Sequence, residues 1–380
     1  MKKNKVPGFV ITLLLCLLCT VVTAACCLLM DDDGATSDKY LSVINILQEN
    51  SIVDTDVVKL EDAAARAIVD SLEDDWSYYL DADEYKEYQL YAANEYVGIG
   101  VKTAYNSKYG YLAVTSVAAG SPAAAAQIEI GNMITSVNNT DVSSFTPEDL
   151  EGYLKSFGEE KFRLGLQNAQ GGTRTVEMQC QVIFMPPVSW SMQADQVGYI
   201  SVSNFESGCS SYIQDAASDL RADGAKALIL DMRNNPGGLV SELKDTLDYL
   251  LPKGDLFICR DRNGKETMYS SDSNQLGVPL VIMVNKGTEN EAEMFALVMQ
   301  SFGAATIVGE RTSGNGHNQV VIPLEDGSAV RVSKYTYLSA ERKTLATLGG
   351  VVPDVRSTAI ADSSLDVIFE AAMDEAAAKK

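Results

Sequence analysis

The stretch 281-VIMVNKGTENEAEMFALVMQSFGAATIVGERTSGNGHNQ-319 decides the fold of the C-terminal half of the chain. Its first residues are apolar and predict a buried strand, which a short polar loop connects to a helix beginning near Glu291. After a turn at Gly303, Ala305–Gly309 predicts a second apolar strand, followed by a glycine-punctuated loop. This alternation of strands and a helix is typical of an α/β fold.

The turn from the first strand into the helix is the place where α/β enzymes carry a nucleophile. Such a turn lifts one side chain above the sheet edge, beside free backbone N–H groups. In this chain the residue on that turn is Asn290. A carboxamide nitrogen is not nucleophilic and does not titrate at any relevant pH. The position therefore has the setting of a catalytic residue without its chemistry.

Length, composition and charge limit the classes of protein that fit. The chain has 380 residues, which is enough for two or three domains with their own cores. Its 46% hydrophobic and 22% charged residues are ordinary for a globular protein. The formal net charge of -22 excludes nucleic acid as a partner, because phosphates require a basic face. The same charge favours solubility outside the cell.

Residues 1–33 predict a membrane anchor. An almost uncharged run from Val6 to Met30 is long enough to cross a hydrocarbon layer of ~30 Å. The charges that flank this run are Lys2, Lys3 and Lys5 before it and Asp31, Asp32 and Asp33 after it. They predict a single-pass protein of the cell membrane with most of the chain extracytoplasmic. The alternative is a signal peptide cleaved at Thr23-Ala24-Ala25, while Thr23 disfavours Cys26 as a lipid attachment site.

The seven cysteines predict neither a disulfide framework nor a metal site. Four of them lie in or beside the N-terminal segment, at Cys16, Cys19, Cys26 and Cys27. The others are Cys180, Cys209 and Cys259, an odd and widely spaced set that we expect to be small buried hydrophobes. A chain with one histidine also excludes a His-rich metal site.

Residues 38–93 predict a helical N-terminal region. Asp38–Asn50 and Asp56–Leu72 are amphipathic, and apolar residues of the second segment recur on one helical face. The aromatic turn 74-DDWSYYLDADEY-85 then opens a helix that runs to about Ala93. These helices are too short and too separate for a coiled coil, so we expect a packed helical lead-in.

Residues 94–182 change to the period of strands. The strands expected are Val97–Val101, Tyr111–Val117, Ile128–Val137, Lys161–Asn168 and Thr173–Val182, with a helix at Pro147–Phe157. This order, with 96-YVGIG-100 and 121-SPAAAAQIEIGNMI-134, resembles a PDZ domain, although Asn132 stands where such domains usually have aspartate. The resemblance implies that the loop formed by Val97, Gly98, Ile99 and Gly100 holds a peptide's terminal carboxylate while the peptide adds a strand to the sheet. The alternatives are a mere strand bend, or a domain that acts only as a lid or spacer.

Residues 183–358 predict an α/β core. The elements expected before residue 252 are the strands Val197–Val202 and Ala227–Asp231 and the helices Ser207–Asp223 and Leu239–Leu251. A Pro-Gly-Gly sequence ends at Gly238, just before the second helix, and predicts unpaired N–H groups that point outward. Gly237 and Gly238 are therefore candidates for an oxyanion hole, although such a glycine pair is more often structural.

The ordered motifs of the exported chain together resemble the C-terminal processing peptidases of family S41. These motifs are DWSYYL, the PDZ-like region, GYISVSNF, LILDMRNNPGGL, VNKGTENEAE, VGERTSGNGHNQ and GGVVPD. The resemblance implies an endopeptidase with a serine nucleophile and a lysine general base, and with no metal or cofactor. It also implies that the PDZ domain recognises the C-terminal tail of the substrate. The fold expected is a multi-domain α/β chain with a membrane segment, a helical lead-in, a PDZ-like domain and an S41-type core.

The resemblance breaks at the two residues that carry the chemistry. The family's loop is typically GSASASE, and GTENEAE in this chain places Asn290 at the serine nucleophile while retaining Gly287 and Glu293. The later family loop is typically TFGKGxxQ, and TSGNGHNQ places Asn315 at the lysine while retaining Gln319. The 25-residue separation of the two asparagines fits the family without gaps. Removing both members of such a dyad removes the mechanism.

The sequence therefore predicts a non-catalytic protein that binds the C-terminal tails of peptides or proteins. Glu289 and Glu291 flank the site and disfavour an oxyanion, and Asn290 and Asn315, if adjacent, are expected to pair amide to amide. One alternative is an active serine-type endopeptidase with rearranged chemistry, for which Thr288 with His317, or one of Lys286 and Lys334, are the candidate residues. Otherwise His317 is expected to be a solvated loop residue. Another alternative is a scaffold, as a homodimer or as the partner of an active paralogue. Residues 359–380 predict a C-terminal helix, Ser364–Ala378.

Overall fold

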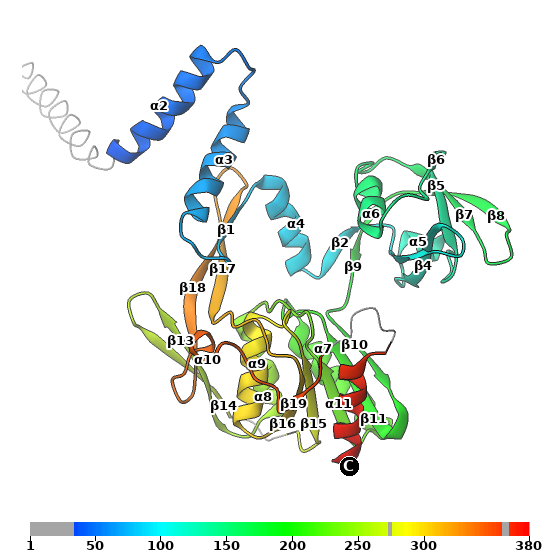
Figure 1. Ribbon diagram of the computed structural model, residues 1–380, viewed down its shortest axis with the longest axis vertical. Helices are drawn as coiled ribbons and strands as arrows, with labels where there is room; N and C mark the ends of the chain where they lie inside the picture. Colours follow the sequence, from blue (N-terminus) through cyan, green and yellow to red (C-terminus); the bar gives the residue numbers. More distant parts are fainter. Residues whose placement is uncertain (1–33, 273–275, 359–364, 380) are drawn as a thin grey trace, which may run out of the picture. The chain divides into compact units, whose positions relative to one another are not determined.

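The computed structural model describes residues 34–272, 276–358 and 365–379, and its backbone divides into two units at Glu73. The described part of the first unit consists of helices α2 (Gly34–Asn50) and α3 (Val57–Asp70) (Figure 1). Asp56 caps α3 by accepting a hydrogen bond from the N–H of Lys59. Apolar side chains of this unit are exposed, among them Ile46 at 59% and Ile68 at 66%. The two predicted helices are thus confirmed, and their packing as a lead-in stays a prediction.

The second unit begins with a short strand and a helix that the aromatic turn positions. Strand β1 (Tyr78–Leu80) pairs with the long strand β18 (Ala329–Ser339) of the core. Helix α4 (Ala82–Ala92) follows, and a reciprocal capping box between Asp81 and Glu84 fixes its start. The predicted helix that ends near Ala93 is thus confirmed.

The next elements form the β-rich domain whose motifs resemble a PDZ domain, and it is called the PDZ domain below. Its strands are β2 (Glu95–Gly98), β3 (Val101–Asn106), β4 (Tyr111–Val117), β5 (Met133–Val137), β6 (Thr140–Asp141), β7 (Phe162–Gln167), β8 (Thr173–Met178) and β9 (Gln181–Phe184). Its helices are α5 (Pro122–Ala125) and α6 (Pro147–Lys155). The main sheet has the order β3-β4-β5-β7-β8, so β3 is an edge strand, and β2 pairs separately with β9. The predicted strand Ile128–Val137 is shorter than expected, because Ile128 lies in the turn after α5 and donates to the carbonyl of Ala123.

The core sheet has the order β10-β11-β12-β15-β16-β19. Its strands are β10 (Val188–Met192), β11 (Val197–Val202), β12 (Ala227–Asp231), β15 (Leu280–Val284), β16 (Ala305–Gly309) and β19 (Val355–Arg356). All neighbours from β11 to β19 are parallel, and β10 is antiparallel at one edge. Every residue of β12 and β15 is buried, as expected for strands covered on both faces.

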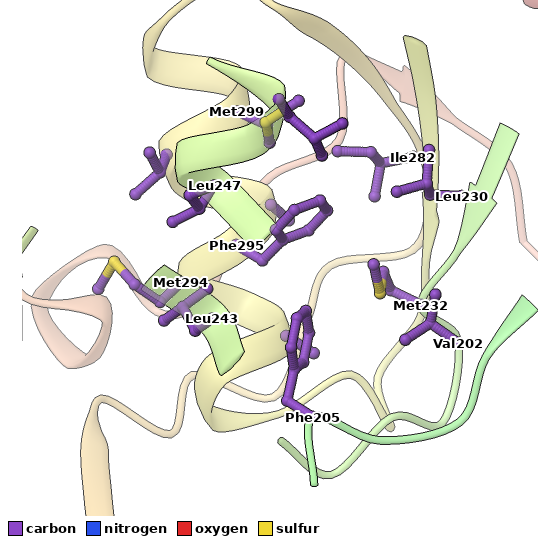
Figure 2. Packing of buried hydrophobic residues seen from close by; sticks show 14 of the residues in the cluster. Val202, Phe205, Leu230, Met232, Leu243, Leu247, Ile282, Met294, Phe295 and Met299 are labelled. Carbon is purple, nitrogen blue, oxygen red and sulfur yellow. The ribbon is translucent and has the colours of Figure 1, made fainter. Parts of the chain in front are cut away.

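Helices cover both faces of this sheet. Helices α7 (Cys209–Ala222), α8 (Val240–Leu250) and α9 (Asn290–Ser301) share one apolar cluster with it, and α11 (Val367–Ala378) shares another on the opposite face. Figure 2 shows Phe295 and Met299 of α9 on the side that faces Leu230 and Ile282 of the sheet, and Leu243 and Leu247 of α8 belong to the same cluster. Burying a side chain of this kind contributes about 1.5–3 kcal/mol. This packing holds the first turn of α9 in place.

A second sheet, which the sequence analysis does not predict, completes the core. Strands β13 (Gly254–Asp261), β14 (Glu266–Ser271) and β17 (His317–Pro323) join β1 and β18 in it, in antiparallel pairs. Helix α10 (Leu345–Leu348) follows β18. The sequence predicts that the glycine-punctuated loop after Gly309 extends to Gln319. It ends earlier, because β17 begins at His317 and pairs with β18.

The predicted multi-domain α/β architecture is confirmed. Cys180, Cys209 and Cys259 are free and buried, also as predicted. The predicted membrane anchor, residues 1–33, lies outside the described residues. Among the helices that the structure describes, none has the length and apolar character needed to cross a membrane.

Candidate active site

The carboxyl ends of β12 and β15 place two loops side by side. Asn285 follows β15, and its Oδ1 accepts a hydrogen bond of 3.0 Å from the N–H of Asn234, which lies in the loop after β12. The N–H of Glu289 donates to the carbonyl of Asn235 at 2.9 Å. These bonds fix the loop that precedes α9 against the loop that contains the Pro-Gly-Gly sequence. The chemistry of the site therefore depends on what these two loops present.

Asn290 is the first residue of α9 and has a left-handed backbone, with a φ of 49°. Asparagine tolerates this conformation better than most residues do, but a non-glycine residue there still signals local strain. Its side chain is buried, and its Nδ2 donates to the carbonyl of Pro236 at 2.9 Å. Its Oδ1 is buried without a hydrogen-bond partner among the described residues. The predicted turn is present, and the side chain on it is a carboxamide.

Glu293 ties the loop before β17 to the first turn of α9. Its carboxylate accepts hydrogen bonds from the hydroxyl of Thr312, from Ser313 Oγ at 2.8 Å and from the N–H of Gly314 at 2.7 Å. Burial raises the pKa of Glu293, and these hydrogen bonds oppose the rise. The N–H of Ser313 also donates to the carbonyl of Thr288 at 3.2 Å. Asn315 is therefore held on a segment that lies against the residues preceding Asn290.

The predicted amide-to-amide pair of Asn290 and Asn315 is not formed. Asn315 is fully buried, and its Oδ1 accepts from the N–H of His317 at 3.2 Å. Its Nδ2, like Oδ1 of Asn290, has no partner among the residues that the structure describes. The two amides thus leave one donor and one acceptor unsatisfied.

The expectation that Gly237 and Gly238 present unpaired N–H groups is wrong. The N–H of Gly237 donates to Oδ1 of Asn235 at 2.9 Å, which closes a local turn. The N–H of Gly238 donates to Oε2 of Glu291 at 2.8 Å. Both candidate oxyanion donors are therefore occupied by side chains of the chain itself.

Glu291 is buried and is bound at both of its oxygens. Oε1 accepts hydrogen bonds from Asn318 Nδ2 at 2.9 Å and from the hydroxyl of Tyr337 at 2.5 Å. Burial, followed by the charge of Glu291, raises the pKa of Tyr337 well above its usual value, so this hydroxyl remains a donor. Sequence reasoning noted the charge of Glu291 but missed Asn318 and Tyr337, which lie on strands that it did not predict.

A second buried carboxyl group, Glu206, lies in the loop between β11 and α7. Burial, followed by the charge of Glu291, raises the pKa of Glu206 to about 7, and Arg331 opposes the rise. The same groups act on Tyr88 of α4, where burial and the charge of Glu206 raise the pKa to about 12. The site is therefore rich in carboxylates and is faced by tyrosines, and Arg331 is the cation that acts on it.

Gln319 lies beside this cation rather than beside a nucleophile. Its Oε1 accepts from Arg331 at 3.3 Å, and its Nε2 donates to the carbonyl of His317 and to Ser333 Oγ. Arg331 also donates to the hydroxyl of Tyr78 at 3.0 Å. The aromatic turn before α4 and the predicted site residue Gln319 thus meet at Arg331.

The alternative catalytic residues are not arranged for catalysis. Thr288 is fully buried, and its hydroxyl donates to the carbonyl of Met232 at 2.9 Å and accepts from the N–H of Asn285 at 3.0 Å. Lys286 and Lys334 are both exposed, so neither is desolvated as a lysine general base requires. The turn before α9 uses the threonine hydroxyl structurally.

The prediction that His317 is a solvated loop residue is wrong. It begins β17, is half-buried, and its ring lies 6.2 Å from that of Trp76, measured between centroids. Its Nδ1 is buried and has no hydrogen-bond partner among the described residues. The hydroxyl of Thr288 is bonded elsewhere, so the two residues do not form a pair in this structure.

The PDZ domain has a groove beside its edge strand. A cavity of about 250 Å³ is lined by Tyr96, Gly98, Ile99, Gly100, Val101, Lys102, Thr103, Pro147, Leu150, Glu151 and Leu154. Among the described residues, none accepts a hydrogen bond from the N–H of Ile99 or Gly100. Val97 does not line the groove; it pairs with Val182 and packs against the apolar core of the domain. Three of the four residues predicted for carboxylate binding thus meet at the groove.

This combination of features defines a class of protein: an α/β peptidase core with a nucleophile-type turn, joined to a PDZ domain. The model of peptidase family S41 matches residues 196–357, and the PDZ domain model matches residues 88–167. The α/β core thus matches peptidase family S41, and the domain before it matches the PDZ domain.

Relatives and solved structures agree with this family. The chain is 29% identical over 311 residues to the chloroplastic C-terminal processing peptidase of Tetradesmus obliquus, covering 77% of this chain and 67% of that one. It is 28% identical to the carboxy-terminal processing protease CtpA of Bacillus subtilis, covering 80% and 65%. The match thus spans about two thirds of the length of these relatives.

Two solved structures share the fold. The photosystem II D1 C-terminal processing protease aligns with a TM-score of 0.50 at 24% identity, over 89% of this chain and 97% of that one. The tricorn protease aligns with a TM-score of 0.51 at 16% identity, over 81% of this chain and 31% of that one.

Proposed function

We propose that this protein is a non-catalytic member of its family that binds the C-terminal tails of peptides or proteins. The observation that carries the proposal is Asn290, which lies on the left-handed turn at the start of α9 where the family places its serine. A carboxamide at this position supplies no nucleophile. The backbone of the site is thus retained while the reacting group is replaced.

The second part of the dyad supports the same conclusion. Asn315 is fully buried at the position that corresponds to the family's lysine, and an amide cannot accept a proton at neutral pH. The nearby cation, Arg331, remains protonated in proteins and donates to Tyr78 and Gln319. Neither residue therefore serves as a general base.

Tail binding is supported by the groove of the PDZ domain. Ile99 and Gly100 line it, and their N–H groups suit a terminal carboxylate. Strand β3 is an edge strand, so its backbone is available to a peptide that adds one more strand. Leu150 and Leu154 of α6 line the same groove and favour an apolar last side chain in the tail.

The location and partners follow from the same proposal. Residues 1–33 anchor the protein in the cell membrane, and the domains that follow are extracytoplasmic. A scaffold role has support in the first unit, where Leu41, Ile46 and Ile68 expose apolar surface on α2 and α3. We propose that these helices associate with a second copy of the chain or with an active paralogue.

Two assays test the function. Purified protein is incubated with casein and with tail peptides, and we expect no cleavage product above that of a blank. Immobilised peptides with free and with amidated C-termini are then compared in a pull-down, and we expect recovery only on the free carboxylate. Cleavage contradicts the loss of catalysis, and equal recovery on both peptides contradicts tail recognition.

A further inference from the structure

Three donors from separate segments of the core converge on the carboxylate of Glu291. The N–H of Gly238, just before α8, binds Oε2 at 2.8 Å. Asn318 of β17 and Tyr337 of β18 bind Oε1 at 2.9 and 2.5 Å. Glu291 is 2% exposed, so the carboxylate is removed from solvent. The donors surround an anion as they would surround a bound ligand.

The surroundings favour a negative charge at this point. Burying a carboxylate is costly unless hydrogen bonds replace its hydration, and these three bonds do so. Glu291 also lies in the first turn of α9. The N–H of Gly238, from which it accepts a hydrogen bond, lies just before the first turn of α8. The N-terminal ends of helices carry partial positive charge. Two helix ends and two side-chain donors therefore stabilise one anion.

We propose that the space between the N–H of Gly238, Asn318 Nδ2 and the hydroxyl of Tyr337, called the cleft below, is a carboxylate-binding site that the chain fills with the side chain of Glu291. The side chain occupies the N–H of Gly238, so a peptide carbonyl or a free carboxylate cannot reach this donor while Glu291 is in place. The inference rests on the proposed loss of catalysis for one consequence only: a chain with the serine and the lysine restored still cleaves slowly while Glu291 is in place. Glu291 is thus a third block, independent of Asn290 and Asn315.

The direct test removes the internal carboxylate and offers an external one. Glu291→Ala leaves the N–H of Gly238, Asn318 Nδ2 and the hydroxyl of Tyr337 around an empty space. We expect sodium formate to raise the melting temperature of this variant by about 3 °C or more relative to sodium chloride at equal ionic strength. The wild type shows no such difference, because its site is filled.

Two matched variants separate a specific site from a general salt effect. Glu291→Gln keeps the volume of the side chain but removes its charge, so it is expected to be destabilised without a response to formate. Glu289→Ala removes a carboxylate from the same turn, where that side chain is half-exposed, and is also expected to show no response. If the alanine variant is unfolded in chloride, formate is expected to refold it. The inference is overturned if formate neither stabilises nor refolds Glu291→Ala beyond these two controls.

A cleavage assay tests whether Glu291 slows catalysis in variants that carry the family's serine and lysine. We expect Asn290→Ser with Asn315→Lys to cleave a tail peptide about a hundredfold more slowly than the same variant with Glu291→Ala, which is the size of losing one oxyanion donor. Equal cleavage by the two overturns the inference. Cleavage by the wild type contradicts the proposed function and leaves the formate result intact. The formate response decides the inference even where neither reverted variant cleaves.

Discussion

The groove of the PDZ domain and the cleft of the peptidase core both present backbone N–H groups at a glycine-containing loop, but in opposite states. In the groove, the N–H groups of Ile99 and Gly100 have no acceptor among the described residues. In the cleft, the N–H of Gly238 is bound to Glu291 and that of Gly237 to Asn235. Under the proposed function the first site receives an external carboxylate, whereas the second already contains an internal one.

This difference separates recognition from chemistry. A loop of unpaired N–H groups costs stability unless a ligand or water satisfies it, and the proposed tail carboxylate would satisfy it. A cleft whose donors are bonded to its own side chains no longer incurs that cost, because each polar group has a partner. The comparison can be tested by changing one residue at a time. Trp76 and Trp190 both lie outside residues 94–182, so tryptophan fluorescence reports on the core alone.

The largest effect is expected at Gly238. Its φ is 154°, and an added Cβ would lie 2.3 Å from the carbonyl carbon of Phe205. Strain and overpacking together predict that Gly238→Ala lowers the free energy of unfolding of the core by about 3 kcal/mol. Urea unfolding followed by tryptophan fluorescence measures this. The control is Gly264→Ala, at a φ of 80° with open space around it, and an equal loss in both variants contradicts the steric explanation.

The next effect concerns the charge of the cleft. Burial raises the pKa of Glu206 to about 7, so the folded protein binds a proton that the unfolded chain releases near pH 4.5. Stability is therefore lost as the pH rises from about 4.5 through 7, by up to about 3 kcal/mol from this group. Urea unfolding at pH 5 and pH 8 is expected to show a smaller loss in Glu206→Gln. An identical pH dependence in the variant and the wild type contradicts this assignment.

A change in the groove is expected to weaken tail binding without changing the stability of the core. Gly100 has a φ of 87°, and an added Cβ would lie 2.2 Å from Cβ of Ser121. Gly100→Ala must therefore displace the loop that carries the carboxylate-binding N–H groups, and we expect tail affinity to fall at least about tenfold, or 1.4 kcal/mol. Fluorescence anisotropy with a labelled tail peptide measures the affinity. Gly110→Ala, at a φ of 72° in open space, should bind as the wild type does, and the tryptophan transition should not move in either variant.

The sequence predicts the two halves of this comparison unequally. The groove can be predicted from local sequence patterns, since 96-YVGIG-100 and helix α6, which line it, lie within one domain. The turn at Asn290 is also local, because an apolar strand runs directly into a helix. The filling of the cleft is not local: Glu291, Gly238 and Tyr337 are distant in sequence, and β17 and β18 are half-exposed strands without a continuous apolar run. Long-range hydrogen bonds of this kind follow from packing, which composition and periodicity do not specify.

The smallest effect is expected at Asn290 itself, and it bears on why an asparagine occupies this turn. Asn290→Ser removes the bond from Nδ2 to the carbonyl of Pro236 and places a residue with less tolerance for the left-handed region at a φ of 49°. We expect a loss of about 1 kcal/mol in the free energy of unfolding and no gain in cleavage.

Asn290→Gly separates the two causes of this small loss. Glycine also lacks the bond to Pro236, but it adopts a positive φ without strain, so its folded state recovers the backbone part of the loss. If the glycine variant is more stable than the serine variant, backbone conformation dominates at this turn. If the two are equal, the hydrogen bond to Pro236 accounts for the loss, and the asparagine is retained for its amide. If Asn290→Ser by itself cleaves a peptide, Glu291 does not block the cleft. The groove and the cleft would then differ only in the reacting side chains, not in the availability of their N–H groups.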